Sequence, residues 1–228
     1  MNSARRLGRD RRRPAWPPMM ESPRSPPMTL TLYGSAHSRA SMVRWYLGEK
    51  GIPYTFTILD MAAGEHRQEP FTTINPFGKV PALVDDSLSG ADGGPLKLFE
   101  SGAILLHLAE HHGREFEGEG GAARRSLAAQ WILFANATLG PAMFVAASKP
   151  EELRRLLDTL EGQIGTGPLL AGAWGDPGWG VADCALQAYL AYLPMFCRDL
   201  DLSRWPTLEA AITATSARPA YLAAMGKA

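Results

Sequence analysis

Residues 74–83, INPFGKVPAL, constrain the fold of this chain more than any other stretch. An X–Pro bond ahead of a short apolar run can adopt the cis form, which makes a tight turn and leaves the preceding backbone exposed. We expect the Val80–Pro81 peptide to be cis. The free N–H and C=O groups of Val80 could then pair with a peptide-like ligand, as an added strand does.

A second block, residues 99–104 (FESGAI), predicts the other half of a binding site. Phe99 ends an apolar run, and Glu100 and Ser101 open a helical pattern. A carboxylate, a hydroxyl and the unpaired N–H groups of a helix start would lie together there. Because the helix start can bind a carboxylate and Glu100 can bind an ammonium group, the two blocks predict a site for a small zwitterion.

The stretch before these blocks predicts a β-α-β unit. Residues 29–33 (TLTLY) and 54–59 (YTFTIL) alternate apolar and polar side chains, as strands do. Between them, Ser38 can cap a helix that Gly51 ends. We therefore expect a parallel strand pair joined by a right-handed crossover.

The remainder of the first half predicts a hairpin followed by a helix. Residues 82–85 and 96–99 have the pattern of paired strands, and residues 101–111 have that of a helix with one apolar face. The resulting order, β-α-β-loop-β-β-α, is that of a thioredoxin-like domain. We place this domain at residues 28–112.

A glycine- and charge-rich linker at residues 113–121 leads to a second domain, residues 122–228, whose pattern is helical throughout. Leu127, Trp131 and Phe134 share one face of its first long helix. Residues 148–151 (SKPE) have the form of a capping box, which predicts the next helix start. The expected fold is an α/β thioredoxin-like domain followed by an all-helical domain.

The charge distribution and the cysteine spacing limit which partners this protein can bind and which cellular compartment it can occupy. Residues 1–27 hold seven arginines against Asp10 and Glu21, a charge of +5, so the rest carries −5 because the whole chain stands at +0. An acidic body argues against nucleic acid as the main partner. Cys184 and Cys197 have neither metal-site nor redox-motif spacing, and we interpret them as buried hydrophobic residues in a reducing compartment.

The first 27 residues, rich in arginine and proline, should be disordered. They lack the apolar core of a secretory signal, and no stretch approaches the roughly 18 apolar residues that span a bilayer. We expect a cytoplasmic protein without a membrane partner. For the extension itself, the alternatives are a transit peptide, a true start at Met28, and a basic segment that touches RNA or membrane.

Two sets of motifs resemble a known family. NPFGKVPAL followed by FESGAILLHLAE is similar to the glutathione-binding half of the cytosolic glutathione transferases, and LLAG, VADCAL and WPTLEAAITATSARPAYLAAM resemble their helical half. The resemblance covers nearly everything from Met28 onward. It implies a homodimer with glutathione as co-substrate. It also implies that Asp183 is the buried aspartate of the family's folding motif, although Gly180 stands where relatives have Ser or Thr.

Conjugation needs a thiolate, and a free thiol with a pKa near 8.5 is only a few per cent ionised at pH 7. The loop before the first helix offers Ser35, Ser38 and Arg39, and it has no cysteine and no tyrosine beyond Tyr33. Serine-type relatives imply Ser38 as the activating residue, or Ser35 in another comparison. GSAHSRAS most resembles the cyanobacterial chi class, which implies Arg39. A helix cap for Ser38 and a solvated side chain for Arg39 are the alternatives.

The resemblance also implies the ligand contacts. The glutathione-binding candidates are Lys79, Val80, Pro81, Glu100, Ser101, His66 and Arg67. An apolar second substrate needs a hydrophobic pocket beside the thiol, and each candidate for it also fits a core position. These candidates are Trp131, Phe134, Met143 and Phe144.

Three histidines, His107, His111 and His112, lie near a predicted helix end with no matching carboxylate cluster, so we expect no metal site. The predicted function is conjugation of the glutathione thiolate to small hydrophobic electrophiles, with reduction of organic hydroperoxides as a further activity. The alternatives are a non-catalytic binding or scaffold protein that kept the fold, and a glutathione-dependent isomerase or dehalogenase.

Overall fold

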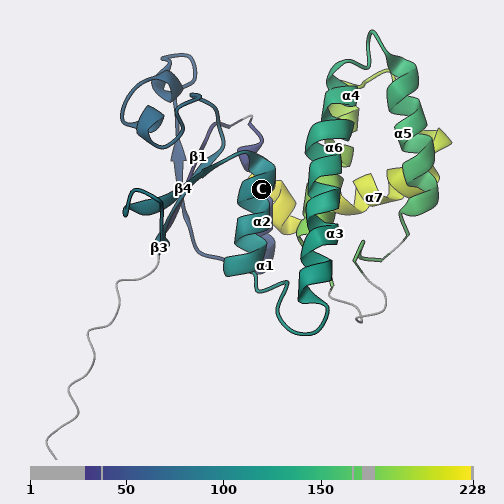
Figure 1. Cartoon of the computed structure of the whole chain (residues 1–228). Coiled ribbons are helices and arrows are strands. Elements are labelled where there is room, and N and C mark those ends of the chain that lie inside the picture. The colour runs from purple at the N-terminus through teal and green to yellow at the C-terminus, as the bar shows by residue number, and fades with distance from the viewer. Residues whose placement is uncertain (1–28, 37, 166, 171–177, 227–228) are drawn as a thin grey trace, which may run out of the picture.

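The computed structural model describes residues 29–36, 38–165, 167–170 and 178–226, and the predicted extension at 1–27 lies outside them. Figure 1 shows two lobes, a β-sheet with helices and a bundle of helices. The first lobe comprises β1 (Leu30–Gly34), α1 (Ala40–Lys50), β2 (Thr55–Ile58), η1 (Glu65–Arg67), η2 (Phe71–Thr73), β3 (Ala82–Ser89), β4 (Pro95–Phe99) and α2 (Ser101–His111). The second comprises α3 (Gly121–Leu133), η3 (Phe134–Leu139), α4 (Gly140–Phe144), α5 (Pro150–Gln163), α6 (Val181–Phe196), η4 (Leu202–Arg204), α7 (Pro206–Ser216) and α8 (Pro219–Ala224).

The sheet has the order β2-β1-β3-β4. β1 runs parallel to β2, and β3 runs antiparallel to both β1 and β4. The predicted order of strands and helices is confirmed, and with it the thioredoxin-like class of the first lobe. β3 extends to Ser89 instead of ending at Asp85, because its pairing with β4 continues through a register irregularity between those residues.

The two lobes share one apolar core. α1 and α2 lie between the sheet and the helical bundle (Figure 1). Leu32 in β1, Leu83 in β3 and Leu105 in α2 are fully buried, and the same cluster continues through Leu139 and Leu190 of the second lobe. Folding of the sheet and of the bundle is therefore coupled by hydrophobic burial across the boundary.

α2 and α3 approach each other closely at Gly102. A Cβ atom placed on Gly102 would lie 2.7 Å from Cγ2 of Ile132 and 3.2 Å from Nδ2 of Asn136. Such separations are shorter than van der Waals contact, so the approach of the two helices requires glycine here. This contact fixes how the end of the sheet lobe meets the first helix of the bundle.

The first helix of the bundle changes its winding partway. The sequence predicts one helix over residues 124–146, whereas α3 continues through the π-helical segment η3 before α4 begins. Short π-helical segments occur inside α-helices and are frequent at functional sites. η3 carries Asn136, which takes part in the site described below.

The same helical run corrects one expectation about membranes. The run Gly121–Phe144 passes a test of length and composition for a membrane span, with a mean hydropathy of 1.2. The test window is 39% buried inside the protein, and core helices of non-membrane proteins pass the same test. The run packs against α2 and α6.

The chain returns to the first lobe at its end, where α8 packs on α1. Arg218 donates two hydrogen bonds to the carboxylate of Glu49, at 2.6 and 2.7 Å. These bonds are the main reason why the pKa of Glu49 lies below its ordinary value, against the opposing effect of partial burial.

Asp183 at the start of α6 has the structural role that the sequence predicts. Its Oδ1 accepts a hydrogen bond from the N–H of Leu169 and its Oδ2 accepts one from the N–H of Gly180, both at 3.0 Å. The residue is 2% exposed, and burial raises its pKa despite these bonds. Gly180 serves as the N-cap without a side chain, and the carboxylates of Asp183 and Glu115 accept from the N–H groups of Gly180 and Val181 at this helix start.

The capping-box prediction at residues 148–151 is wrong. α5 begins at Pro150 with Lys149 as its N-cap. The hydroxyl of Ser148 donates instead to the carbonyl of Val145 at 3.0 Å. A short turn after α4 therefore uses the serine that the sequence pattern assigns to the next helix.

Both cysteines are free thiols, in agreement with the sequence analysis. Cys184 is fully buried, and its Sγ donates to the carbonyl of Met42 at 3.4 Å. Burial raises the pKa of Cys184 and of Cys197. Neither thiol is suited to be a nucleophile, because the thiolate is the reactive form.

Candidate active site

The two sequence blocks meet at a cavity of about 390 Å³. Such a volume is within the range of small-molecule sites. The loop before α1 contributes Arg39, and the remaining wall comes from the turn before β3 and the start of α2. The lining residues are Arg39, Asn75, Phe77, Lys79, Val80, Pro81, Phe99, Glu100 and Ser101.

The turn before β3 is held by Asn75, which the sequence analysis did not single out. The Asn75 side chain is buried; its Nδ2 donates to the carbonyl of Lys79 at 2.7 Å, and its Oδ1 accepts from the N–H of Phe77 at 3.1 Å. The Val80–Pro81 peptide is cis, as predicted. Asn75 thus sets the geometry that presents the backbone of Val80 to the cavity.

Glu100 and Ser101 form the opposite wall at the N-terminus of α2. Glu100 has φ 69°, in the left-handed region that residues with side chains rarely adopt. Strained backbone of this kind clusters at ligand-binding sites. The carboxylate of Glu100 and the free N–H groups of the helix start together offer one negative and one positive partner for a zwitterion.

The three candidate activating residues occupy different places. Arg39 lines the cavity, whereas Ser35 and Ser38 are not among its lining residues. The Ser38 hydroxyl donates to the carbonyl of Ser35 at 3.1 Å and accepts from the N–H groups of Ser35 and Ala40 at 3.1 and 3.3 Å. Since a hydroxyl has one proton, Ser38 already uses it in this turn. The N-cap of α1 is Arg39, so Ser38 stands one position before the cap and its hydroxyl contacts the first residue of the helix from there.

A chain of polar contacts connects Arg39 to Ser101 through the second lobe. Nη1 of Arg39 lies 3.5 Å from the hydroxyl of Tyr189 in α6. That hydroxyl donates to Oδ1 of Asn136 at 3.1 Å, and the Ser101 hydroxyl donates to the same oxygen at 3.0 Å. Nδ2 of Asn136 donates to the carbonyl of Ile132, which fixes the orientation of its amide. Tyr189 and Asn136 were not predicted, because nothing in their local sequence marks them.

His66 and Arg67 lie next to the site but do not line it. A Cβ on Gly78 would lie 2.8 Å from the carbonyl of His66 and 3.5 Å from Cγ of Arg67. The imidazole of His66 is buried, and its Nδ1 has no hydrogen-bond partner, while Arg67 is exposed. Their predicted contact with a glycyl carboxylate stays a prediction, and Arg67 is the more accessible of the two.

The predicted hydrophobic residues divide into core and surface positions. Met143 is 3% exposed and belongs to the core, and Trp131 and Phe134 pack against that core with ring centroids 5.9 Å apart. Phe144 is 64% exposed, and its ring centroid lies 5.5 Å from that of Phe196. None of the four lines the Arg39 cavity.

Aromatic rings of α6 link the cavity to that exposed pair. The centroids of Tyr189 and Tyr192 lie 5.9 Å apart, and those of Tyr192 and Phe196 lie 6.2 Å apart. Phe196 then contacts Phe144. Burial raises the pKa of Tyr192, so its hydroxyl stays protonated and serves as a hydrogen-bond partner of Ser41 at 2.8 Å. Tyr189 and Tyr192 are buried, so of these four rings Phe196 and Phe144 are the ones that face solvent.

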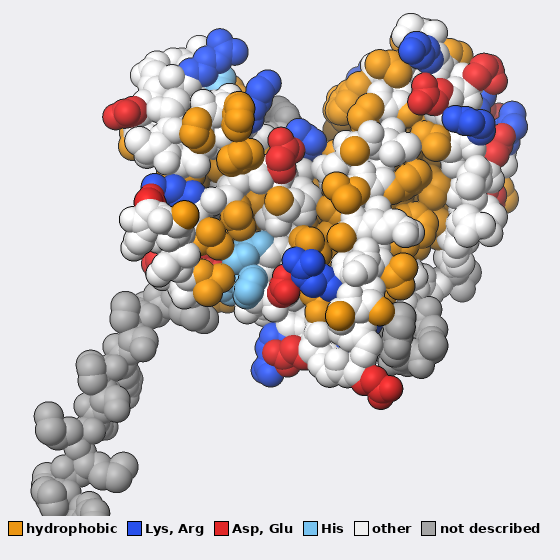
Figure 2. Space-filling view, viewed as in Figure 1, with side chains coloured by type: hydrophobic (Ala, Val, Ile, Leu, Met, Phe, Trp, Pro, Cys, Tyr) orange, Lys and Arg blue, Asp and Glu red, His pale blue; other side chains and the backbone are white. Residues whose placement is uncertain are grey.

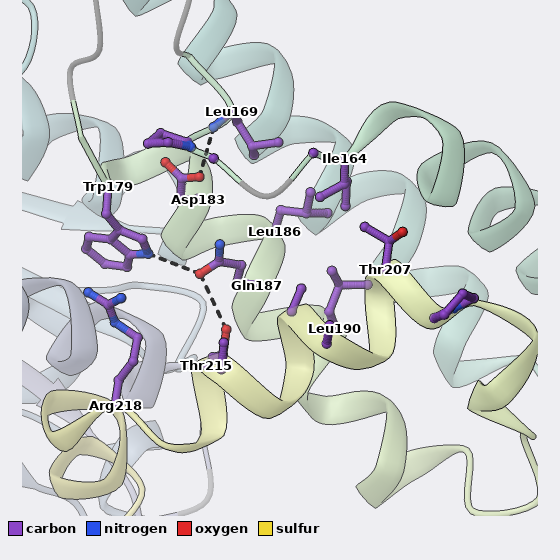
Figure 3. A pocket seen from close by; sticks show the side chains of 17 residues that line it. Ile164, Leu169, Trp179, Asp183, Leu186, Gln187, Leu190, Thr207, Thr215 and Arg218 are labelled. Atoms are coloured by element: carbon purple, nitrogen blue, oxygen red, sulfur yellow. Dashed lines mark hydrogen bonds between the residues drawn. The ribbon is translucent and has the colours of Figure 1, made fainter.

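A larger cavity of about 690 Å³ lies elsewhere, between α6, α7 and the segment before α6 (Figure 3). Gln187 is its polar centre, because its Oε1 accepts from Nε1 of Trp179 at 3.0 Å and from the hydroxyl of Thr215 at 3.4 Å. Arg218 at its edge is paired with Glu49. None of its lining residues belongs to the blocks at 74–83 and 99–104, so we assign the site to the smaller cavity despite the difference in volume.

The expectation about the three histidines is wrong in one respect. A carboxylate does lie beside them, since Oδ2 of Asp85 in β3 accepts hydrogen bonds from Nε2 of His107 and Nε2 of His112 at 2.8 and 2.7 Å. Asp85 is distant in sequence and lies in a strand, so the local spacing of the histidines did not reveal it. These three side chains form a cluster that could hold a metal ion.

Comparison with known proteins identifies the family. Residues 28–110 match the glutathione S-transferase N-terminal domain. Glutathione S-transferase F10 of Arabidopsis thaliana is 30% identical over 189 residues, which cover 73% of this chain and 79% of that protein. The chain belongs to the glutathione S-transferase family.

Other relatives match over shorter stretches. A glutathione S-transferase of Silene vulgaris is 41% identical over 92 residues, covering 40% of this chain and 39% of its own length. The disulfide-bond oxidoreductase YfcG of Escherichia coli is 37% identical over 113 residues, covering 49% of this chain and 51% of its own length. The chain thus spans about half or less of the length of these two relatives.

A solved structure has the same fold over nearly the whole chain. A glutathione transferase of Burkholderia graminis, solved with two glutathione molecules bound per subunit, superposes with a TM-score of 0.69 at 28% identity. The superposition covers 89% of this chain and 90% of that chain. The fold is therefore a thioredoxin-like domain followed by the helical domain of this family.

Proposed function

We propose that this chain is a glutathione transferase that conjugates the glutathione thiolate to small hydrophobic electrophiles. The observation that carries the proposal is the meeting of Arg39, Val80 and Glu100 around one cavity. The backbone of Val80 pairs with the peptide, Glu100 binds the ammonium group, and the start of α2 binds the neighbouring carboxylate. The thiol then lies toward Arg39.

Arg39 is the group that stabilises the thiolate in this proposal. A guanidinium is always protonated and donates charge-assisted hydrogen bonds to an anion. Lowering a thiol pKa by two units needs about 2.7 kcal/mol of preferential stabilisation of the anion. The contact with Tyr189 supports the guanidinium from the second lobe. This role agrees with the resemblance to the chi class, with which we group the chain.

The electrophile would lie along the aromatic row of α6. Phe144 and Phe196 are 64% and 55% exposed, so their rings are available to an apolar partner. Tyr192 connects them to Tyr189 and hence to Arg39. We further propose a cytoplasmic homodimer, as the family resemblance implies.

The test is the titration of bound glutathione, followed by thiolate absorbance near 240 nm. Wild type should lower the pKa of the bound thiol below its free value. Arg39→Ala should return the pKa toward the free value and lower kcat/KM by about tenfold or more, whereas Arg39→Lys should retain part of the effect. Arg125→Ala, which removes an exposed guanidinium paired with Glu110, is the matched control. A folded wild type that leaves the thiol pKa unchanged contradicts the proposal.

A second candidate is glutathione-dependent disulfide reduction. It is favoured by the relative named as a disulfide-bond oxidoreductase and by the solved relative that binds two glutathione molecules per subunit. The lining residues include no cysteine, so a second glutathione would supply the attacking thiol. In this reaction two glutathione thiols reduce one disulfide to two thiols and leave as glutathione disulfide.

Parallel assays separate the two candidates. Loss of a chloronitrobenzene or isothiocyanate substrate measures conjugation. Production of glutathione disulfide from a small organic disulfide, coupled to glutathione reductase, measures reduction. Turnover in the first assay alone supports conjugation, and turnover in the second alone supports disulfide reduction. A protein that binds to immobilised glutathione but turns over neither substrate fits the scaffold alternative.

A further inference from the structure

The cluster of Asp85, His107 and His112 lies outside the proposed glutathione site. The side chains are 1%, 8% and 9% exposed, respectively. Their ligand atoms all lie within 4.8 Å of one another. Figure 2 shows histidine side chains gathered on one face of the first lobe.

The fold brings these residues together from two elements. Asp85 lies in β3, where it pairs with Leu30 on one side and Leu96 on the other. His107 lies in the last turns of α2, and His112 is the C-cap of that helix. Because His112 leaves the regular helical path, its imidazole turns back toward β3. His111 stays on the helix and is exposed.

The carboxylate is held in one orientation by its own neighbours. Oδ1 of Asp85 accepts hydrogen bonds from the N–H and from the hydroxyl of Ser87, at 2.9 and 2.6 Å. Oδ2 therefore faces both imidazoles. Ligating carboxylates in metal sites are typically supported by hydrogen bonds of this kind on the second oxygen.

We propose that Asp85, His107 and His112 bind one Zn²⁺ ion. Zinc takes imidazole nitrogen at about 2.0–2.1 Å and carboxylate oxygen at about 2.0–2.2 Å in a tetrahedral arrangement, which places ligand atoms roughly 3.3 Å apart. The two Asp85–histidine separations of 2.8 and 2.7 Å need to widen by about half an ångström, a shift within the reach of side-chain rotation. Water would take the fourth position.

Charge and helix geometry favour a cation at this place. The two imidazoles are neutral ligands, so the buried carboxylate is the only full charge among the three groups. The C-terminal end of α2 carries the negative end of the helix dipole, which attracts a cation. Nitrogen ligands select zinc over magnesium or calcium, both of which prefer oxygen.

The site would tie β3 to the far end of α2. α2 has 11 residues and rises about 16 Å, so the ion would lie well away from Ser101 and the glutathione cavity. A zinc ion there would hold β3, whose first residue follows Pro81, against α2, whose first residue is Ser101. Its effect is on stability, and no step of the conjugation passes through it.

The test uses the full untagged chain after treatment with EDTA, because a polyhistidine tag would itself bind zinc. Calorimetric titration with ZnCl₂ should show one saturable site, and CoCl₂ should give the visible absorption of a four-coordinate cobalt site. Zinc should raise the melting temperature of the wild type. Asp85→Asn and His112→Asn should each weaken zinc binding by at least about tenfold and remove the increase in melting temperature.

His111→Asn is the matched control, since it removes an exposed imidazole that lies beside the ring of His107, with centroids 4.8 Å apart, but is not one of the three proposed ligands. It should keep one zinc site with an unchanged affinity. If a folded wild type shows no saturable zinc binding, the cluster is a hydrogen-bond network only and the proposal is overturned. Binding that survives both Asp85→Asn and His112→Asn overturns it as well, because the ion then lies elsewhere. The wild-type titration decides the question even where a variant fails to fold.

Discussion

The Ser101 hydroxyl donates a hydrogen bond to Oδ1 of Asn136 over 3.0 Å, and this bond joins the sheet lobe to the helical bundle at the proposed ligand site. Asn136 receives the Tyr189 hydroxyl on the same oxygen. One amide of the second lobe thus organises the start of α2 and supports Arg39 through Tyr189. The residues that line the site lie in the first lobe, and the second lobe supports two of them through Asn136 and Tyr189.

Asn136→Ala should destabilise the protein by about 2 kcal/mol, because it leaves the hydroxyls of Ser101 and Tyr189 without their acceptor. Ser101→Ala should cost about 1 kcal/mol. The double variant should cost less than the sum, since both changes remove the same bond. Urea unfolding measures these values, with Thr138→Ala, an exposed change in the same segment, as the control. Strict additivity would show that the bond contributes nothing.

Ser38→Ala should lower stability by about 1 kcal/mol through loss of the hydrogen bonds that its hydroxyl makes in the turn before α1. The pKa of bound glutathione should stay at the wild-type value, because Arg39 stabilises the thiolate in our proposal. Urea unfolding and the titration near 240 nm measure the two effects separately. Ser126→Ala, on the exposed side of α3, is the control for removal of a serine hydroxyl. A thiol pKa that rises in Ser38→Ala would transfer the activating role to Ser38.

Asp183→Ala should destabilise the protein by roughly 2–3 kcal/mol, since two backbone N–H groups lose a buried charged acceptor. Asp183→Asn should cost less, because its amide oxygen still accepts one of the two bonds. Glutathione affinity per folded molecule should not change. Thermal and urea unfolding provide the measurement, and Asp199→Ala at an exposed position is the control. Equal stability of Asp183→Ala and wild type would contradict the structural role.

The Glu49–Arg218 pair should make the stability of the folded protein depend on pH in the acid range. The pKa of Glu49 is lowered in the folded protein, chiefly by hydrogen bonds from Arg218. A carboxyl group with a depressed folded pKa adds stability above its unfolded pKa of about 4.3, and this stability is lost as the pH falls through the folded pKa. Glu49→Gln should therefore be less stable than wild type at pH 7 and should lose less stability between about pH 5 and pH 3.

Unfolding measured across that pH range tests the pair. Glu151→Gln removes an exposed carboxylate that also pairs with an arginine, and it should leave the acid dependence of the wild type intact. An unchanged slope in Glu49→Gln would mean that the pair is solvated too well to affect folding.

Local patterns predicted the regular elements of this fold well. α2 spans Ser101–His111, as the apolar spacing predicts, and α1 ends at Gly51 in the left-handed conformation. The failures occur where a turn competes with a helix signal. Ser148 satisfies the carbonyl of Val145 within a turn, and the sequence offers no way to see which of the two uses prevails.

The site was predictable in part for a physical reason. Val80 and Glu100 lie in motifs whose backbone geometry is determined by residues close to them in the sequence. Arg39 lies at the start of a helix that the local sequence also predicts. Asn136 lies 35 positions after its partner Ser101 in the sequence, and Tyr189 lies 150 positions after its partner Arg39. Asp85 meets His107 from a strand 22 positions earlier. Contacts of this kind depend on the packing of whole helices, and a single sequence carries no local signal for them.

Gly102 has a consequence for how such proteins can diverge. With no space for a methyl group between it and Ile132, a larger residue at either point must be matched by a smaller one on the opposite helix. The amino-terminal half therefore cannot be exchanged freely for that of another relative. Chimaeras that ignore this pairing should push α2 and α3 apart beside the proposed glutathione site, even when each half retains its own motifs.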